Sequence, residues 1–91
     1  MIWKIEFDAK AKKELLRLDK QIQKRIMKLL EDRILKKRNP RSTGSALQNT
    51  LSGLWRYRVG DYRVICKIED SYLIVLVISV GHRKDVYKLT L

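Results

Sequence analysis

Cysteine is almost absent from this 91-residue sequence, in which Cys66 is the only one. An intrachain disulfide is therefore impossible, and a zinc site built on cysteine thiolates is excluded. Proline occurs once and glycine four times, which argues against a disordered chain. The longest apolar run, residues 72–80, is too short to cross a bilayer, and the first residues lack the apolar stretch of a signal peptide. We expect one folded cytoplasmic domain, residues 1–91, that does not enter a membrane.

The residues that several kinds of catalytic site require are also missing from the sequence. His82 is the only histidine, and no carboxylate cluster stands out that could complete a metal site. Paired-carboxylate and Ser-His-Asp chemistry lack partners. Glycine-rich phosphate motifs of the Walker and Rossmann types are missing. We therefore expect no metal and no cofactor.

Acidic residues are scarce beside basic ones: 10 Asp and Glu stand against 21 Lys and Arg, which gives a formal charge of +11 and an isoelectric point near 10.1. Such a charge predicts a polyanionic partner. Nucleic acid is the first candidate, an acidic protein the second and an anionic membrane the third. Hydrophobic residues still make up 45% of the chain, enough for the core of one small domain.

A β-hairpin with arginines on one face is the most informative pattern. Residues 54–59 and 62–66 alternate around the two-residue loop Gly60-Asp61, which is a strong hairpin signal. With this loop Arg58 faces Arg63, and Arg56 shares their face. The other face is predicted to be buried and holds Trp55, Tyr57, Val59, Tyr62, Val64 and Cys66.

The arginine face does not serve folding, because like charges directly opposite each other destabilise a strand pair. A bound polyanion would remove this repulsion, so we interpret the face as a phosphate-binding surface. On this interpretation, Arg63→Ala leaves stability unchanged or raises it slightly.

The rest of the pattern predicts an α+β fold. Residues 2–7 alternate as a strand, Asp8 is a helix N-cap, and Asp19 ends one helix and caps the next. The helical hairpin has an apolar stripe at spacings of three to five, formed by Leu15, Leu18, Ile22, Ile26, Leu29 and Ile34. Residues 72–80 are apolar on both faces and form a central strand that Gly81 ends. The order β-α-α-β-β-β predicts a strand and helical hairpin packed on one face of a mainly antiparallel four-stranded sheet.

Periodicity fails over residues 36–50, and residues 36–44 of this stretch form a long basic loop. It is either a solvated linker or an anchor on a nucleic-acid backbone, and both interpretations stay open. Leu47 and Leu51 are expected to tie its far end to the core. The candidate RNA-binding residues of the loop are Lys36, Lys37, Arg38 and Arg41.

Candidate catalytic residues follow Gly81. His82 is structural or catalytic, and Tyr87 either stacks on a base or covers the core. Metal-free RNA cleavage uses the 2′-hydroxyl of the RNA as nucleophile, so the protein aligns it, stabilises the phosphate oxygens and protonates the leaving oxygen. Arginines are suited to stabilising the phosphate oxygens but are poor general bases. No carboxylate partner for His82 is evident before Leu54.

Two stretches, residues 54–65 and 77–87, resemble the RelE branch of the RelE/ParE toxin superfamily, and the similarity extends over nearly the whole chain. The resemblance implies a RelE-like fold and the toxin of a type II toxin–antitoxin pair. It implies an mRNA interferase, a ribosome-dependent and metal-independent endoribonuclease that cuts mRNA in the A site, leaves a 2′,3′-cyclic phosphate and inhibits translation. It also implies two partners: a cognate antitoxin in a hetero-oligomeric complex, and the ribosome with its mRNA and rRNA.

The resemblance also assigns roles by position. Arg63 is similar to the family arginine at the scissile phosphate, and Arg83 to the arginine that stabilises or protonates the leaving group. Tyr87 is similar to the tyrosine that stacks on the mRNA and orients it.

Arg56 and Arg58 stand where well-studied RelE members carry lysines. A lysine with a lowered pKa can act as a base, whereas an arginine cannot readily do so. Two alternatives follow. Either Arg58 acts electrostatically and another acceptor takes the proton of the 2′-hydroxyl, or His82 takes part. The resemblance gives Arg56 an RNA-binding role.

Two other functions compete with mRNA cleavage. One is a ParE-like inhibitor of DNA gyrase without nuclease activity, although ParE-like members generally lack the combination of Arg63, Arg83 and Tyr87. The other is a basic nucleic-acid-binding module without chemistry. Expression alone separates the last from a toxin, because only a toxin arrests growth.

Overall fold

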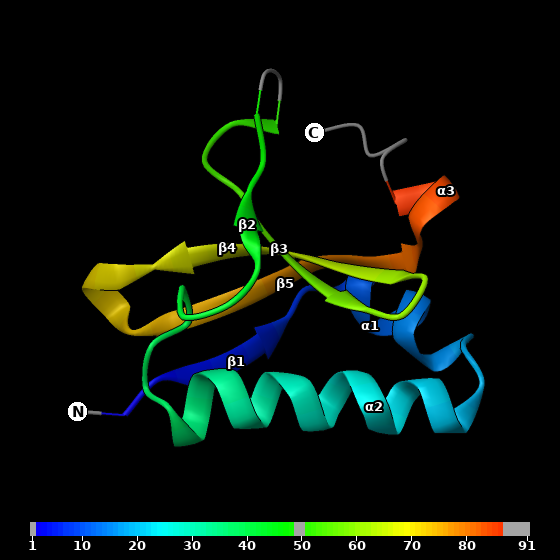
Figure 1. Ribbon diagram of the computed structural model, residues 1–91, viewed down its shortest axis with the longest axis horizontal. Coiled ribbons are helices and arrows are strands. Elements are labelled where there is room, and N and C mark those ends of the chain that lie inside the picture. The colour runs from blue at the N-terminus through cyan, green and yellow to red at the C-terminus, as the bar shows by residue number, and fades with distance from the viewer. Residues whose placement is uncertain (1, 49–50, 87–91) are drawn as a thin grey trace.

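The computed structural model describes residues 2–48 and 51–86 (Figure 1). The elements follow one another along the chain as β1 (Lys4–Phe7), α1 (Ala9–Leu16), α2 (Lys20–Leu30), the π-helical turn η1 (Glu31–Lys36), β2 (Ser45–Ala46), β3 (Trp55–Val59), β4 (Tyr62–Glu69), the 3-10 turn η3 (Asp70–Tyr72), β5 (Ile74–His82) and α3 (Arg83–Val86).

Five strands form one sheet in the order β1-β5-β4-β3-β2. β1 runs parallel to β5, and the other neighbours are antiparallel. The predicted α+β class and mainly antiparallel sheet are confirmed, but the count of four strands was wrong. The extra strand is β2, whose Ser45 and Ala46 pair with Arg56 and Trp55. Two residues are too few to show an alternating pattern, so periodicity cannot detect this strand.

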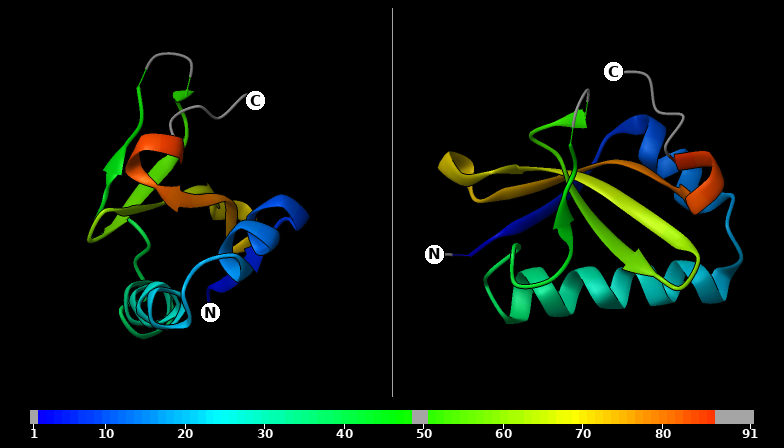
Figure 2. Two further views of the ribbon diagram at one scale, coloured as in Figure 1. Left: turned by 90° about the vertical axis from the view of Figure 1, so that its right-hand side faces the viewer. Right: turned by 45° about the horizontal axis from the view of Figure 1, so that its top comes forward.

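The helical hairpin covers one face of the sheet, as Figures 1 and 2 show. Both predicted caps are confirmed: the Ala11 N–H donates to Asp8 Oδ1 at 2.7 Å and the Gln21 N–H to Asp19 Oδ1 at 3.2 Å. No helix within the described ranges combines the length and hydrophobicity needed to cross a membrane. The main core joins helix and sheet, and its buried residues are Ala11, Leu15, Ile26, Leu30, Ile34, Tyr57, Val59, Val64, Cys66, Val75, Val77 and Val80.

The predicted hairpin register is confirmed pair by pair, with Arg58 opposite Arg63 and Tyr57 opposite Val64. Gly60 takes a positive φ of 59° in the loop, a conformation that glycine adopts without steric cost. All six residues of the predicted buried face contribute to the main core or pack against it.

The central strand is shifted from its predicted range. Residues 70–72 form the turn η3, and Leu73 then takes a positive φ of 54° before β5 begins. At its other end β5 continues through Gly81 to His82, so the prediction that Gly81 ends the strand was wrong. Pairing with β4 explains this, because Tyr62 and Arg63 remain opposite His82 and Gly81.

A second, smaller cluster lies on the face of the hairpin that carries the arginines. Leu54 and Ile65 are buried there, with Leu47, Leu51 and Ile78 packed against them. The predicted anchoring of the basic loop through Leu47 and Leu51 is therefore confirmed. The arginine face is consequently part apolar and part charged.

Candidate nucleic-acid interface

The three hairpin arginines differ in exposure. Arg58 is exposed and Arg56 half-buried, whereas Arg63 is only 5% exposed. The expectation of one open arginine face was therefore wrong for Arg63. Its Nη1 donates to the carbonyl oxygens of Gly60 at 2.8 Å and Tyr62 at 3.0 Å. The guanidinium turns towards the hairpin loop, where carbonyl dipoles stabilise its charge.

We now expect Arg63→Ala to lower the free energy of unfolding by about 1–3 kcal/mol, since hydrogen bonds from a charged donor to the loop carbonyls are lost. This reverses the expectation drawn from the sequence. Urea denaturation measures the effect. Arg58→Ala is the matched control, because it removes the same charge from the opposing position but leaves those hydrogen bonds in place. Equal stability of Arg63→Ala and wild type would contradict the structural role.

Arg56 of β3 is held by a side chain of the edge strand β2. Its Nη2 donates to Ser45 Oγ at 2.8 Å, and Ser45 is its partner across β2 and β3. The side chain is therefore oriented at the protein surface. A preorganised guanidinium loses less conformational freedom when it binds a phosphate.

The end of β5 brings His82 beside the hairpin loop. Its ring meets Tyr62 edge to face, with centroids 5.7 Å apart and an interplanar angle of 81°. His82 Nδ1 accepts a hydrogen bond from the Lys84 N–H at 3.2 Å, so a neutral ring carries its proton on Nε2. The Arg83 N–H donates to the Asp61 carbonyl at 2.8 Å, which ties the start of α3 to the same loop.

Register and a backbone hydrogen bond thus place Arg63, His82 and Arg83 at the same end of the sheet, although 18 residues of chain lie between the first two. The His82 ring lies with Tyr62 on the side of α1, whereas Arg63 belongs to the other face of the hairpin. Arg83 is exposed, and Arg58 lies across the hairpin from Arg63. Tyr87, the remaining predicted catalytic residue, lies outside the described residues. We call the group of Arg63, His82 and Arg83 the strand-end cluster.

A carboxylate that sequence reasoning missed lies near His82. Glu14 of α1 lines a hollow of about 300 Å³ together with Arg17, Tyr62 and His82. Its Oε1 accepts from Ser79 Oγ at 3.2 Å and from the Val80 N–H at 3.1 Å. Since Glu14 and Ser79 are 65 positions apart, no local pattern could reveal the contact.

The basic loop is fastened to the sheet by aromatic side chains of β3. Trp55 Nε1 donates to the Thr43 carbonyl at 2.8 Å, and the Tyr57 hydroxyl donates to the Pro40 carbonyl. Burial raises the pKa of Tyr57 well above its usual value, which keeps the hydroxyl protonated as a donor. Neither bond was apparent from the loop composition.

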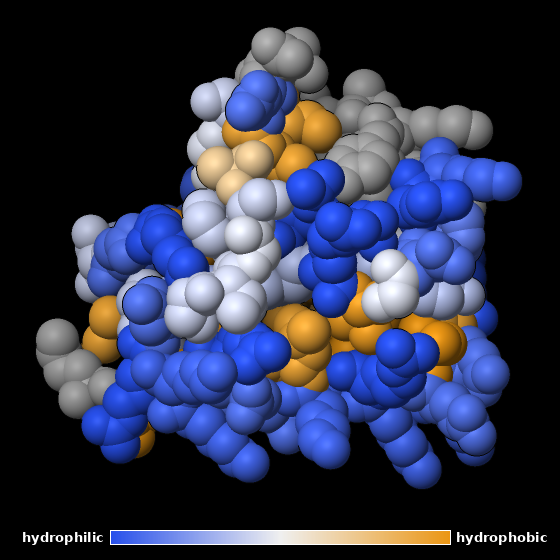
Figure 3. Space-filling view, in the orientation of Figure 1, coloured by the Kyte–Doolittle hydropathy of each residue, from blue (hydrophilic) through white to orange (hydrophobic). Residues whose placement is uncertain are grey.

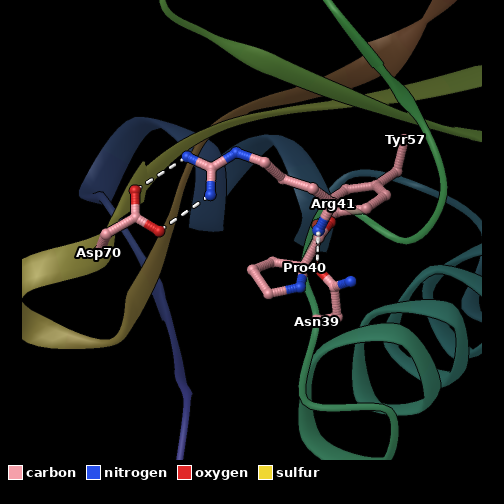
Figure 4. A network of polar contacts seen from close by, with 5 residues as sticks. All are labelled: Asn39, Pro40, Arg41, Tyr57 and Asp70. Atoms are coloured by element: carbon pink, nitrogen blue, oxygen red, sulfur yellow. Dashed lines mark hydrogen bonds and ion pairs between the residues drawn. The ribbon is translucent and has the colours of Figure 1, made fainter.

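Arg41 is engaged within this loop region (Figure 4). Its Nη1 and Nη2 lie 2.8 and 2.9 Å from the two carboxylate oxygens of Asp70, and these hydrogen bonds lower the pKa of Asp70. Binding of Arg41 to a nucleic acid would require this pair to open. Lys36, Lys37 and Arg38 are exposed, but the loop lies at the opposite end of the molecule from α3 (Figure 1). The structure does not bring the loop and the strand-end cluster together.

Metal-binding side chains do not converge within the described ranges, where no group of three or more His, Cys, Asp or Glu is placed to hold an ion. Cys66 is buried in the core, and burial raises the pKa of its thiol. A neutral thiol is a poor metal ligand and nucleophile. Cys66 therefore acts as a small core side chain.

The fold and surface define a small basic α+β protein. A helical hairpin covers one face of its sheet, and the β3–β4 hairpin carries arginines on the other face. A family profile described as the ParE toxin of the type II toxin-antitoxin system, parDE, matches residues 5–87. The chain therefore belongs to this family of toxins.

Three relatives place it further. It is 32% identical to the toxin RelE of Mycobacterium tuberculosis over 93% of this chain and 86% of that protein. It is 35% identical to the toxin RelG of the same organism, over 56% of this chain and 59% of RelG. The toxin–antitoxin complex RelBE2 from M. tuberculosis contains a chain with a TM-score of 0.81 and 26% identity, covering 93% of this chain and 95% of that one. The chain is thus a RelE-like member of the RelE/ParE superfamily.

Proposed function

We propose that this protein is a ribosome-dependent, metal-independent endoribonuclease that cuts mRNA in the A site and thereby inhibits translation. The observation that carries the proposal is the strand-end cluster, in which strand register and a backbone hydrogen bond place Arg63, His82 and Arg83 at one end of the sheet beside the hairpin loop. The similarity to toxins named RelE and RelG supports it. The site of action is the cytoplasm, where ribosomes and mRNA are found.

Each residue of the cluster has a role that its geometry allows. The exposed guanidinium of Arg83 stabilises the charge on the leaving 5′-oxygen. The charge of Arg63 keeps the electrostatic potential positive at the loop end of the hairpin. His82 donates from Nε2 to a phosphate oxygen, because its Nδ1 already accepts the Lys84 N–H. The 2′-hydroxyl of the RNA gives its proton to solvent and its oxygen attacks the phosphorus. The bond from phosphorus to the 5′-oxygen breaks, the 5′-oxygen takes a proton from solvent, and a 2′,3′-cyclic phosphate remains. Tyr87 stacks on the mRNA in this scheme.

The second partner is a cognate antitoxin in a hetero-oligomeric complex. The RelBE2 structure, a toxin–antitoxin complex similar to this chain over nearly its whole length, supports this. A formal charge of +11 favours an acidic antitoxin that covers the basic surface and masks its charge. Such binding weakens as the salt concentration rises.

Primer extension on an mRNA translated in vitro with stalled ribosomes tests the nuclease. The expected result is cuts inside the A-site codon that require both ribosomes and this protein. The cuts should need no divalent metal beyond the amount that keeps the ribosome intact. The same mRNA without ribosomes is the control and should stay intact. An uncut mRNA and normal translation would reject the proposal.

Gyrase inhibition is the second candidate, because the matching family profile is described as a ParE toxin. A supercoiling assay with purified DNA gyrase distinguishes the two functions. The nuclease predicts normal supercoiling at protein concentrations that stop translation. Loss of supercoiling with intact mRNA would assign the protein to the gyrase inhibitors.

A further inference from the structure

Within the described residues, the last part of β5 has a neighbouring strand on one side only. β1 pairs with residues 74–77 of β5, and the Asp8 N–H donates to the Val77 carbonyl at 3.0 Å where β1 ends. β5 continues to His82 with β4 as its neighbour on the other side. The chain turns into α1 after Asp8, so a helix lies beside this part of β5 (Figures 1 and 2). The backbone on this side of the strand end therefore needs side-chain partners.

Glu14 of α1 supplies the acceptor that a further strand would otherwise provide. Its Oε1 accepts from the Val80 N–H at 3.1 Å and from Ser79 Oγ at 3.2 Å. Ser79 and Val80 are buried, and a buried N–H that loses its acceptor is costly. The other carboxylate oxygen lies 3.5 Å from Nζ of the exposed Lys10, and such a surface ion pair contributes little to stability. The hydrogen bonds of Oε1 therefore connect α1 to the end of β5.

Two features of β5 make its end easy to displace. The register of β4 and β5 shifts between Ile65 and Cys66, so that Ile78 is an extra residue in β5. Such a bulge bends a strand and changes the direction of the side chains that follow it. Gly81 comes next, and a glycine inside a strand adds flexibility and has no side chain that could pack. The hydrogen bond from Val80 to Glu14 lies between these two features and fixes the strand there.

Glu14 lines the same hollow as the His82 ring. The residues that surround this space of about 300 Å³ include Glu14, Arg17, Tyr62, Gly81 and His82. His82 follows Val80 by two residues, so both side chains lie on the α1 side of the sheet. The hydrogen bond at Val80 thus fixes the backbone from which the ring projects, while Tyr62 and the Lys84 N–H fix the direction of the ring.

We infer that Glu14 is a positioning residue for the strand-end cluster: its carboxylate fixes the part of β5 from which His82 and Arg83 reach the RNA. The effect on cleavage rests on the proposed function, whereas the placement of the strand end does not. A displacement of about 1 Å at a reacting group can slow a reaction about 10²-fold. Both oxygens of Glu14 already have partners within the protein, so Glu14 acts through β5 and does not touch the RNA.

Apolar packing holds the helical layer on the sheet independently of Glu14. Ala11 and Leu15 of α1 are buried in the main core. Figure 3 shows that apolar side chains also reach the surface as a strip between the hydrophilic residues over α2 and those over β3. The Glu14 side chain itself is only half-buried. Substitutions at position 14 should therefore move the end of β5 and leave the protein folded.

Two substitutions of Glu14 separate the reach of its side chain from its charge. Glu14→Gln removes the charge and keeps an acceptor oxygen at the same distance from α1, whereas Glu14→Asp keeps the charge on a shorter side chain. His82 is the only histidine, so its ring protons are assigned without ambiguity by NMR. The NOE between the His82 and Tyr62 rings should be lost in Glu14→Asp and retained in Glu14→Gln. Lys10→Ala, which removes only the ion pair, should also retain it.

Hydrogen exchange of the Val80 amide reports the hydrogen bond directly. Exchange should be about ten-fold faster in Glu14→Asp than in wild type, and close to the wild-type rate in Glu14→Gln and Lys10→Ala. Thermal unfolding confirms that each variant is folded. Should Glu14→Asp not fold, Glu14→Gln still decides, because loss of its ring NOE would overturn the inference.

Single-turnover cleavage on stalled ribosomes measures the consequence for the reaction. Glu14→Asp should lower the maximal rate about 10²-fold and leave the protein concentration that gives half of this rate within a few-fold of wild type. Glu14→Gln and Lys10→Ala should cleave at close to the wild-type rate. Equally slow cleavage by Glu14→Gln and Glu14→Asp would assign the effect to charge and overturn the inference, as would an unchanged ring NOE in Glu14→Asp. Loss of that NOE, with no cutting even by wild type, would support the placement of the strand end and reject the nuclease.

Discussion

Replacement of Arg83 by alanine is expected to slow ribosome-dependent mRNA cleavage by about 10²–10³-fold and to leave the free energy of unfolding unchanged. The side chain is exposed, and the hydrogen bond that ties this residue to the hairpin loop runs from its backbone N–H to the Asp61 carbonyl. Alanine keeps that backbone bond. The guanidinium is therefore available to the transition state and dispensable for the fold.

Lys84→Ala is the matched control for Arg83→Ala. Lys84 is the next residue in α3, is exposed and carries the same charge. Its backbone N–H, which bonds His82 Nδ1, is retained in the variant. Single-turnover cleavage by Lys84→Ala should stay within a few-fold of wild type. If both variants lose activity equally, general charge and not the position of Arg83 determines cleavage, and the role assigned to Arg83 is wrong.

Local sequence patterns predicted the parts of the fold that local physics determines. The Gly60-Asp61 loop and the alternation around it set every pair of the β3–β4 register, because a one-residue slip would expose the whole buried face. The caps Asp8 and Asp19 were likewise predictable, since each bonds an N–H two or three residues away. In both cases the interacting groups are close in sequence.

Features that depend on contacts distant in sequence were not predictable. The pair of Arg41 and Asp70 spans 29 residues, and the contact of Glu14 with Ser79 spans 65. Nothing in either local segment points to the other. The sequence therefore indicated either a solvated linker or an anchor on a nucleic-acid backbone. In the structure the loop is hydrogen-bonded to β3 and to the turn before β5.

Arg63 shows why facing like charges can be tolerated without a ligand. The sequence indicated repulsion between Arg58 and Arg63, and the cross-strand pairing is as predicted. The structure separates the charged groups by turning Arg63 into the loop carbonyls while Arg58 remains exposed. Alternation specifies the face on which a side chain lies, but the direction of a long side chain depends on nearby acceptors. The part of the arginine face that is open to solvent is therefore formed by Arg58 and Arg56 more than by Arg63.

Tyr57→Ala is expected to lower the free energy of unfolding by about 3–5 kcal/mol, the largest stability effect that we predict for this chain. Tyr57 is 1% exposed and lies in the main core between the sheet and the helices. Truncation leaves a cavity and also removes the hydrogen bond that fastens Pro40 and the basic loop. Urea denaturation should show a lower midpoint with an unchanged slope.

Tyr57→Phe separates the two contributions, since it keeps the ring and removes only the hydroxyl. The substitution should lower the free energy of unfolding by about 1 kcal/mol at neutral pH. Burial raises the pKa of Tyr57 in the folded state, so its contribution to stability is complete below the unfolded value of about 10 and falls as the pH rises above it. The phenylalanine variant should therefore lose less stability than wild type above pH 10. Some loss of stability at high pH should persist in Tyr57→Phe, because burial also raises the pKa of Cys66. Equal alkaline sensitivity of the two proteins would show that the Tyr57 hydroxyl is not buried as described.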